Sequence, residues 1–369
     1  MKKTSNESRL GRFSYLLKGG AKPRRSFALM MALVLVGMLS LAGVVSADNY
    51  YNGTPPQIND LSGLSGTVNG SVEVLFNDTW KTSSPIDYDD AWANFTLPVA
   101  DSATTPIQFA RLYVVVYTGN MNLNYKGNFS VTLKDGAYSS YAYPVVHKAL
   151  DLDYDRIDGT SYAPVSGVLK NLSRTTSDYV AIIDVKDTLT AWDNTDFRVH
   201  LETWNESIRL QEGLTKFDGR IKEVKLVYGY NTTTNPVDVH YWLNEGNDPV
   251  TKKLVDPYTA NQTVFRGVIV PDSPTSYVAN LWVDFVAGNS TSGPGYGNYW
   301  WYDADGTETD LSPGEFYPPM VNQGVYAGLN NWTWDRNTGI TISSGNNVLA
   351  YSRTNDYYKM IFALFTIKY

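Results

Sequence analysis

The sequence predicts an all-β protein of the β-sandwich or jelly-roll class. Short runs rich in Val, Ile, Tyr and Phe recur along the chain, Asn, Gly or Asp residues end these runs, and helical periodicity is almost absent. Aromatic residues make up 14% of the chain, including 27 Tyr and 10 Trp, a content typical of extracellular β proteins. Many short strands at loose spacing favour one large or two packed β domains after a signal peptide.

Ten segments carry the strongest strand pattern. They cover residues 71–77, 111–119, 128–136, 179–185, 196–204, 221–230, 264–270, 279–288, 347–352 and 360–368. One helical turn is expected within residues 184–192. Because apolar and charged residues alternate in residues 221–230, we expect Lys222, Glu223 and Lys225 to face solvent.

The first 47 residues are predicted to be a secretory signal peptide. Eight basic residues precede an unbroken apolar run of 19 residues, Phe27 to Val45, and the motif Val-Ser-Ala ends at Ala47. The adjacent Arg24 and Arg25 leave twin-arginine export open beside the general secretory route. The length of the apolar run also leaves an uncleaved N-terminal anchor open. The mature chain is predicted to divide into an N-terminal β-sandwich region, residues 48–215, and a C-terminal β region, residues 216–369.

Charge and cysteine content narrow the range of partners. The leader holds eight of the 30 basic residues and one of the 37 acidic residues, so the mature chain carries a net charge of −14. This negative charge argues against nucleic acid and anionic membrane surfaces as binding partners, because both attract clustered Lys and Arg. It favours cations as partners. The chain has no Cys, which excludes disulfides, thiol catalysis and iron–sulfur clusters. No direct membrane span is expected after cleavage.

The mature chain holds eleven Asn-x-Ser/Thr sequons, spread evenly along its length. β turns favour the same residue types, but this density indicates a glycan-coated surface protein. The turn-like sequons are expected to carry glycan first, whereas two sequons, at Asn94 and Asn128, lie against strands. The turn-like sequons are Asn52, Asn231, Asn261 and Asn289, and the others are Asn69, Asn77, Asn94, Asn128, Asn171, Asn205 and Asn331.

Three aspartates, Asp151, Asp153 and Asp155, alternate in sequence and would share one face of a strand. Neighbours on one face lie about 7 Å apart, so each pair of these charges repels by roughly 1–2 kcal/mol. Basic cross-strand neighbours or a bound hard cation would relieve the repulsion. Calcium is therefore the one cofactor that we predict.

Residues 299–310, YWWYDADGTETD, combine aromatic residues with carboxylates around Gly306. The segment has three interpretations: a hairpin tip without chemistry, a calcium loop, or an aromatic platform for a sugar. Alternating oxygen ligands suit calcium, although the EF-hand pattern is not met. The candidate ligands are Asp303, Asp305, Glu308 and Asp310.

No catalytic constellation is recognisable, and the protein is predicted not to be an enzyme. His147, His200 and His240 are isolated from one another, without the spacing of metal ligands, and no G-x-S-x-G nucleophile turn occurs. A glycosidase needs only two facing carboxylates, which the sequence of an acidic chain cannot single out. We therefore predict no catalytic or cofactor-binding residues.

Four segments carry a resemblance to a known family: ARLYVVVYTGN, YKGNFSVTL, FDGRIKEVKLVYGYN and VHYWLNEGND. In this order they resemble a family of uncharacterised β-rich surface proteins of methanogenic archaea, over about Asn52 to Asp284. The most specific pieces are Phe217–Arg220 and Tyr241–Gly246. The resemblance implies a subunit of an S-layer or of a tubular sheath, and it implies no catalytic residues.

Taken together, these features predict a secreted structural subunit of an archaeal cell envelope that self-assembles into a protective lattice or tube at the cell surface. Its partners would be copies of itself and other envelope proteins. The strand-like segments 72–77 and 360–369 are the candidate donors of strands to neighbouring copies. Alternatively, both segments pair within their own subunit, which we expect for 360–369. The alternative is a secreted adhesin or carbohydrate-binding surface protein, which an exposed aromatic shelf at Trp300 and Trp301 would favour.

The mature protein is expected to begin at Asp48, because Val-Ser-Ala closes the apolar run of the leader. Intact-mass measurement and N-terminal sequencing of the envelope protein check this. Retention of residues 27–45 would establish an anchor instead.

Overall fold

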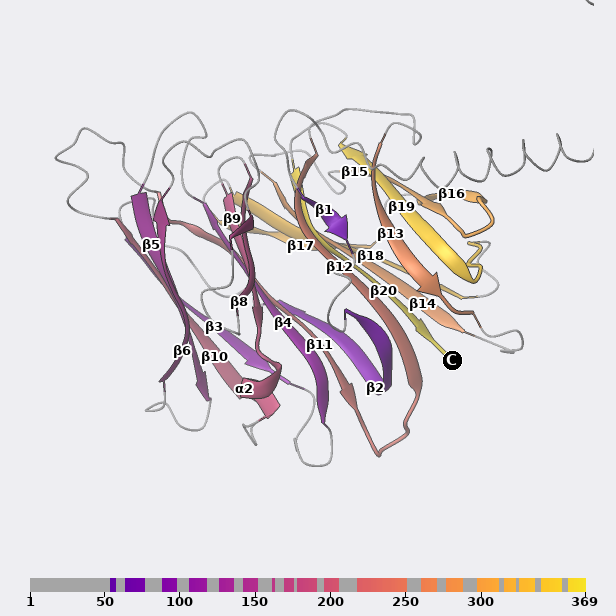
Figure 1. Ribbon diagram of the computed structural model, residues 1–369, viewed down its shortest axis with the longest axis horizontal. Helices are drawn as coiled ribbons and strands as arrows, with labels where there is room; N and C mark the ends of the chain where they lie inside the picture. The colour runs from indigo at the N-terminus through magenta and orange to yellow at the C-terminus, as the bar shows by residue number, and fades with distance from the viewer. Residues whose placement is uncertain are drawn as a thin grey trace, which may run out of the picture. The chain divides into compact units, whose positions relative to one another are not determined.

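The structure is a computed structural model. It describes residues 54–57, 64–76, 88–97, 106–117, 126–135, 142–151, 161–162, 169–175, 178–190, 196–205, 218–250, 260–270, 277–287, 297–311, 315–322, 325–335, 340–353 and 358–369, all within the compact unit Val45–Tyr369. The predicted signal peptide lies outside the described residues. The described chain is almost entirely β-strand, in three antiparallel sheets with a sandwich-like arrangement, so the predicted fold class is confirmed (Figure 1).

Twelve strands form the large sheet. They are β1 (Thr54–Gln57), β2 (Ser65–Phe76), β4 (Ile107–Tyr117), β7 (Ser161–Tyr162), β8 (Leu169–Thr175), β9 (Asp178–Asp184), β11 (Ile221–Asn231), β12 (Asp238–Val250), β14 (Val278–Ala287), β17 (Glu315–Asn322), β18 (Val325–Asp335) and β20 (Tyr358–Lys368). Their order is β17-β18-β14-β20-β12-β2-β11-β4-β9-β8-β7, and β1 also pairs with β12. The sheet takes strands from both sides of residue 216, and the division of the mature chain at that residue stays a prediction.

Two four-stranded sheets accompany the large sheet. The first, here called the β10 sheet, has the order β3-β10-β5-β6, and the second, the β19 sheet, has the order β13-β19-β15-β16. Their strands are β3 (Tyr88–Thr96), β5 (Lys126–Asp135), β6 (Ala142–Asp151), β10 (Asp196–Asn205), β13 (Asn261–Val268), β15 (Gly297–Tyr302), β16 (Glu308–Leu311) and β19 (Gly345–Arg353). The predicted helical turn is present as α2 (Lys186–Thr190).

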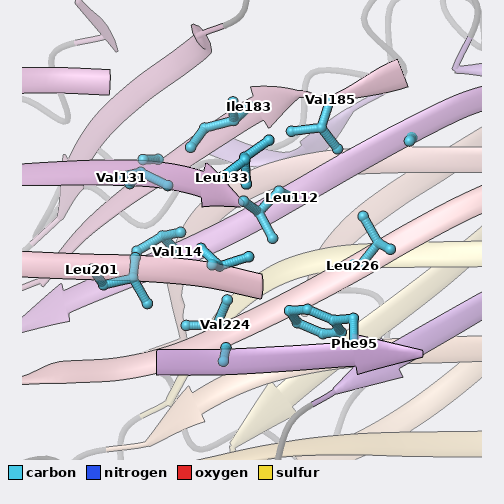
Figure 2. Packing of buried hydrophobic residues seen from close by; sticks show 14 of the residues in the cluster. Phe95, Leu112, Val114, Val131, Leu133, Ile183, Val185, Leu201, Val224 and Leu226 are labelled. Carbon is cyan, nitrogen blue, oxygen red and sulfur yellow. The ribbon is translucent and has the colours of Figure 1, made fainter. Parts of the chain in front are cut away.

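Three hydrophobic clusters lie between the β layers. The first joins the β10 sheet to one face of β4, β9 and β11, where Val131 and Leu133 of β5 pack near Leu112 and Val114 of β4 (Figure 2). The second joins the β19 sheet to β12, β14, β18 and β20. The third contains the opposite faces of strands from both halves of the large sheet.

The third cluster exists because the large sheet folds back on itself. Tyr113 of β4 and Phe362 of β20 have ring centroids 4.7 Å apart, although four strand-to-strand steps separate these strands in the sheet order. In a flat sheet the same two strands would lie about 19 Å apart. The two halves of the large sheet therefore face each other, and the cores of the protein separate four β layers.

β2 forms the corner between the two halves. Residues 65–69 of β2 pair with β12, whereas residues 70–76 pair with β11. The change of partner falls at Gly70, whose N–H donates to the carbonyl of Val237 at 2.8 Å. The Asn69 carbonyl accepts from the N–H of Thr232 at 2.8 Å, and the Asn69 N–H donates to Asn231 Oδ1 at 2.8 Å. A strand that changes partners in this way is a usual means of turning a corner between packed layers.

The fold-back corrects one expectation from the sequence. Lys222, Glu223 and Lys225 do not face solvent but are 5%, 0% and 2% exposed. The reason is that β11 lies near the corner of the folded sheet, where layers cover both of its faces. Alternation along a strand shows which residues share a face, but it does not show whether that face meets water.

The two predicted donor segments have different surroundings in the structure. β2, which contains residues 72–76, pairs with β11 and β12, and β20 pairs with β12 and β14. Residues 358–368 therefore have partners within their own chain on both sides, as expected for the C-terminal segment. Among the described strands, residues 72–76 pair with β11 alone, so strand donation by this segment stays a prediction.

Replacing Gly70 by Ala is expected to destabilise the protein. A Cβ atom at this position would lie 2.3 Å from the carbonyl oxygen of Tyr230, a backbone atom that cannot move aside without disturbing β11. We expect a loss of about 1–3 kcal/mol in the free energy of unfolding, measured by chemical denaturation. Ser65→Ala, at an exposed position of the same strand, is the control and should change stability by less than about 0.5 kcal/mol. Equal stability of the two variants would show that the corner tolerates a side chain.

Candidate functional site

The segment 303–310 is a hairpin tip between β15 and β16. Asp303 holds the turn: its Oδ1 accepts the N–H groups of Asp305 at 3.0 Å and Thr307 at 2.8 Å, and its own carbonyl accepts the N–H of Gly306 at 3.0 Å. Gly306 has a φ of +84°, which favours glycine. The side chain of Asp303 is thus used to build the turn.

The aromatic residues before this tip do not form a surface for a sugar. Tyr299, Trp300 and Trp301 are 2%, 7% and 0% exposed. Trp301 packs within the second cluster, 4.9 Å from the ring of Phe365, and its Nε1–H donates to the carbonyl of Thr341 at 3.1 Å. Of the three interpretations of this segment, the sugar platform is therefore excluded, because Trp300 and Trp301 are both buried; Tyr299 and Trp301 lie in the second cluster.

The calcium sites stay predictions. Asp153 and Asp155 lie outside the described residues, and only the backbone of Asp151 is described, at the end of β6. Asp305, Glu308 and Asp310 are exposed at the hairpin tip. Within the described ranges, no group of three or more His, Cys, Asp or Glu side chains is arranged to hold a metal ion.

The side chains of five predicted glycan acceptors are described. Asn69 and Asn94 are exposed, and Asn231 and Asn331 are partly buried. Asn261 is 3% exposed, and its Nδ2 donates to Asp248 Oδ2 at 2.9 Å, so the structure contradicts its selection as a turn-like acceptor. Asn52, Asn77 and Asn289 lie outside the described residues, and for Asn128, Asn171 and Asn205 only the strand position is described.

The most unusual chemical feature is a set of charged side chains between the two halves of the large sheet. We call it the central ionic network; it comprises Arg111, Asp178, Asp184, Lys222, Glu223, Lys225, Glu245, Asp284 and Lys359. Lys225 of β11 forms ion pairs with Asp284 of β14 and, at 3.2 Å, with Glu223. Asp284 and Glu223 are both 0% exposed, so this group is sealed from water.

Two further groups complete the network. Asp178 of β9 pairs with Lys222 at 2.9 Å and with Lys359 of β20. Arg111 of β4 pairs with Asp184 at 2.7 Å and lies 3.6 Å from Glu245 of β12. Five strand-to-strand steps separate β20 from β9 in the sheet order, so the contact between Lys359 and Asp178 directly ties the two halves together.

Two carboxylates of the network, Glu223 and Asp178, have pKa values that are shifted in opposite directions. Burial raises the pKa of Glu223 well above its usual 4.5, and the negative charge of Asp284 raises it further. Burial would also raise the pKa of Asp178, but Lys222 and Lys359 outweigh it and hold this pKa below its ordinary value. Burial and the charge of Asp284 thus favour the protonated form of Glu223, whereas Lys222 and Lys359 favour the charged form of Asp178.

β12 connects this network to the second cluster through a buried polar segment, residues 244–248. Its register with β20 shifts between Glu245 and Asp248, which marks a bulge. On one side, Glu245 Oε1 accepts the hydroxyl of Tyr113 at 2.6 Å. On the other, Asp248 Oδ2 accepts the hydroxyl of Tyr351 at 2.6 Å, and Asn244 Nδ2 donates to Thr263 Oγ1 at 2.8 Å. Burial raises the pKa of the hydroxyls of Tyr113 and Tyr351, and the neighbouring carboxylates add to this.

Sequence reasoning missed this network because its members are far apart in the chain. One signal was present: the resemblance singled out Phe217–Arg220 and Tyr241–Gly246, which lie beside or within it. Arg220 pairs with Asp218, at 2.6 Å between Nε and Oδ1 and 3.0 Å between Nη2 and Oδ2. Gly219, with a φ of +70°, supplies the turn before β11.

Glu223→Gln is expected to change how stability depends on pH. In the folded protein burial raises the pKa of Glu223 well above 4.5, its ordinary value, which we take for the unfolded chain. The wild-type protein therefore loses stability as the pH rises above 4.5, by up to about 1.4 kcal/mol per pH unit, until the folded pKa is passed. Because Gln does not titrate, the variant should gain stability relative to wild type between pH 5 and pH 8. Denaturation curves across this range measure the difference.

Glu202→Gln is the matched control, since it neutralises a partly buried glutamate on β10, outside the network. Its stability relative to wild type should vary much less with pH. If Glu223→Gln follows wild type in parallel at every pH, Glu223 does not hold the proton.

No helix of the described residues is long and apolar enough to cross a membrane.

Comparison with known proteins adds a family but no activity. No curated protein matches the chain. Among solved structures it is similar to PNGase F, a glycosylasparaginase from Flavobacterium meningosepticum, with 12% identity, 81% of this chain and 96% of that chain covered, and a TM-score of 0.26. It is also similar to the pilus backbone RrgB of Streptococcus pneumoniae, with 9% identity, 79% of this chain and 50% of that chain covered, and a TM-score of 0.19. Similarities this weak support no inference about fold or activity.

A family model described as "Protein of unknown function (DUF3344)" matches residues 50–368, which is nearly the whole of the predicted mature chain. The match includes every strand that the structure describes. The chain belongs to this family.

Proposed function

We propose that the protein is a secreted structural subunit of an archaeal cell envelope layer, an S-layer or a sheath, in which copies of the chain assemble into a lattice or tube. The observation that carries this proposal is the density of sequons behind an export leader: eleven in the predicted mature chain. The resemblance to surface proteins of methanogenic archaea supports the same class. The proposal assigns no catalytic residue.

The internal construction of the protein suits a load-bearing subunit. The chain has no Cys, so disulfides do not hold its layers together. The central ionic network instead links strands that are far apart in the sheet order, through side chains almost wholly removed from water. Buried ion pairs contribute little net stability compared with apolar packing, but loss of one partner is costly, which favours a single arrangement of the layers. A lattice needs subunits with one fixed shape, because errors in shape accumulate over repeated contacts.

Self-assembly is the property that tests the proposal. The purified mature protein should form ordered arrays or tubes at high concentration in the presence of calcium, visible by electron microscopy. Repeated weak contacts would retain each subunit through avidity. A protein that remains monomeric at millimolar concentration with calcium present would contradict the proposal.

Calcium dependence has its own test, on the exposed carboxylates of the hairpin tip. If calcium joins subunits there, Asp305→Asn combined with Asp310→Asn should raise the calcium concentration needed for half-maximal assembly several-fold. Asp303 is left intact because it builds the turn. The control, Asp187→Asn combined with Asp196→Asn, removes two exposed charges elsewhere. An equal response of both double variants would show that calcium acts only through the overall charge.

The adhesin or carbohydrate-binding alternative loses its main support. It depended on an exposed shelf at Trp300 and Trp301, and both rings are buried. Another exposed aromatic ring, Trp92, lies on the β10 sheet, and its surroundings suggest a different role.

A further inference from the structure

The outer face of the β10 sheet carries an organised group of polar and aromatic side chains. Ala91, Ala93 and Phe95 of β3 are buried in the first cluster, so Trp92 and Asn94 point to the opposite, outer face. Trp92 stacks on His200, its direct cross-strand neighbour, with ring centroids 4.2 Å apart and planes 13° apart. Both rings are partly exposed.

Two cations fix the position of this indole ring. Arg198 of β10 and Lys134 of β5 each lie 4.6 Å from its centroid. Contacts of this kind are worth roughly 0.5–1 kcal/mol each at exposed sites. An ordinary exposed Trp would sample several rotamers, whereas Trp92 is held across the sheet by neighbours on two other strands.

Asn94 is the sequon residue next to this ring on the same face. It lies two residues after Trp92 on β3, is exposed, and begins the sequon Asn94-Phe95-Thr96. Arg198 stands directly opposite, and its Nε donates to Asn94 Oδ1 at 2.7 Å. This bond engages the amide oxygen, the atom that N-glycosylation leaves unchanged, and it fixes the direction of the amide.

We propose that Asn94 carries an N-linked glycan whose first sugar packs against Trp92, which makes the outer face of the β10 sheet a glycan-bearing face. This inference rests on the proposed function as a glycosylated envelope protein. Residues two apart on a strand lie about 7 Å apart on one face, close enough for a pyranose ring on Asn94 to reach the indole. The apolar C–H face of a sugar gains from contact with the part of the pre-positioned indole that His200 and the two cations leave exposed.

The modification itself is a group transfer from a lipid-phosphate-linked oligosaccharide. The bond between the anomeric carbon and the donor's phosphate oxygen breaks, and a bond from that carbon to Asn94 Nδ2 forms. Nδ2 loses one proton, and the lipid phosphate leaves. The amide keeps one N–H and its oxygen, so the bond from Arg198 can persist.

The first test is glycopeptide mass spectrometry on the full chain from a host that glycosylates it. We expect Asn94 to be occupied. If Asn94 is bare while other sequons carry glycan, this inference fails and the envelope proposal stands. If every sequon is bare, the glycosylated-subunit proposal fails together with it.

The second test separates packing on Trp92 from mere occupancy. Thr96→Val removes the sequon but leaves Asn94 and its bond to Arg198 in place. In the wild-type background this change should lower the Tm by about 2 °C. In a Trp92→Leu background, which lacks the aromatic ring, the same change should have almost no effect. A Tm loss of equal size in both backgrounds would overturn the packing of the sugar on Trp92.

The matched control uses Asn69, another exposed sequon. The residue two positions before it is Thr67, which offers no aromatic ring. Removing this sequon by Ser71→Ala should change the Tm equally in the wild-type and Trp92→Leu backgrounds. An effect of Trp92→Leu on this control of the same size as on Thr96→Val would count against a local contact at Asn94.

Discussion

The burial of both faces of the central strands is the constraint on which the rest of this structure depends. When the large sheet folds back at β2, its middle strands lose contact with water on both sides. Every charged side chain on the inner faces must then find its partner within the protein, because an isolated buried charge is too costly to keep. The central ionic network meets this requirement with four basic and five acidic side chains, and burial beside Asp284 favours the protonated form of Glu223. Its members come from β4, β9, β11, β12, β14 and β20, so the same contacts that neutralise charge also hold the two halves together.

The corner at β2 and the network depend on one another. Without the change of partner at Gly70 the sheet would stay open, and Lys359 could not reach Asp178. Without matched charges the closed sheet would bury repulsion between Glu223 and Asp284. The bulge in β12 contacts both neighbouring layers, since Glu245 lies beside Arg111 of the network and Asp248 hydrogen-bonds to Tyr351 of the β19 sheet. Many of the buried polar contacts of the interior therefore involve a segment of five residues, Asn244 to Asp248.

The sequence predicted the class of the fold, and each of the ten segments with a strong strand pattern lies largely within an observed strand. It did less well where a strand is built from turn-forming residues. Residues 244–248 contain Asn, Gly and Asp and resemble a turn, but they continue β12, where Asn244, Glu245 and Asp248 hydrogen-bond to Thr263, Tyr113 and Tyr351. Likewise, Pro318 and Pro319 make β17 hard to recognise from the sequence. This strand lies at the end of the large sheet, where proline is tolerated. Lys222, Glu223 and Lys225 show the main limit: a local pattern reports which residues share a face, whereas their burial depends on strands far along the chain. The hairpin tip at Gly306 was one of three interpretations that the sequence left open, and only the packing of Trp301 excluded the sugar platform.

The position of β20 has a consequence for how the protein is made. This strand is the last in the sequence, but it lies between β12 and β14 in the large sheet. Until residues 358–368 emerge, the edges of these two strands remain open and one side of the second cluster is missing. Folding that depends on such distant pairings is slow, and open edges invite pairing between chains. The C-terminal half of the large sheet therefore closes late, and a chain cut before residue 358 would keep two open strand edges that favour aggregation.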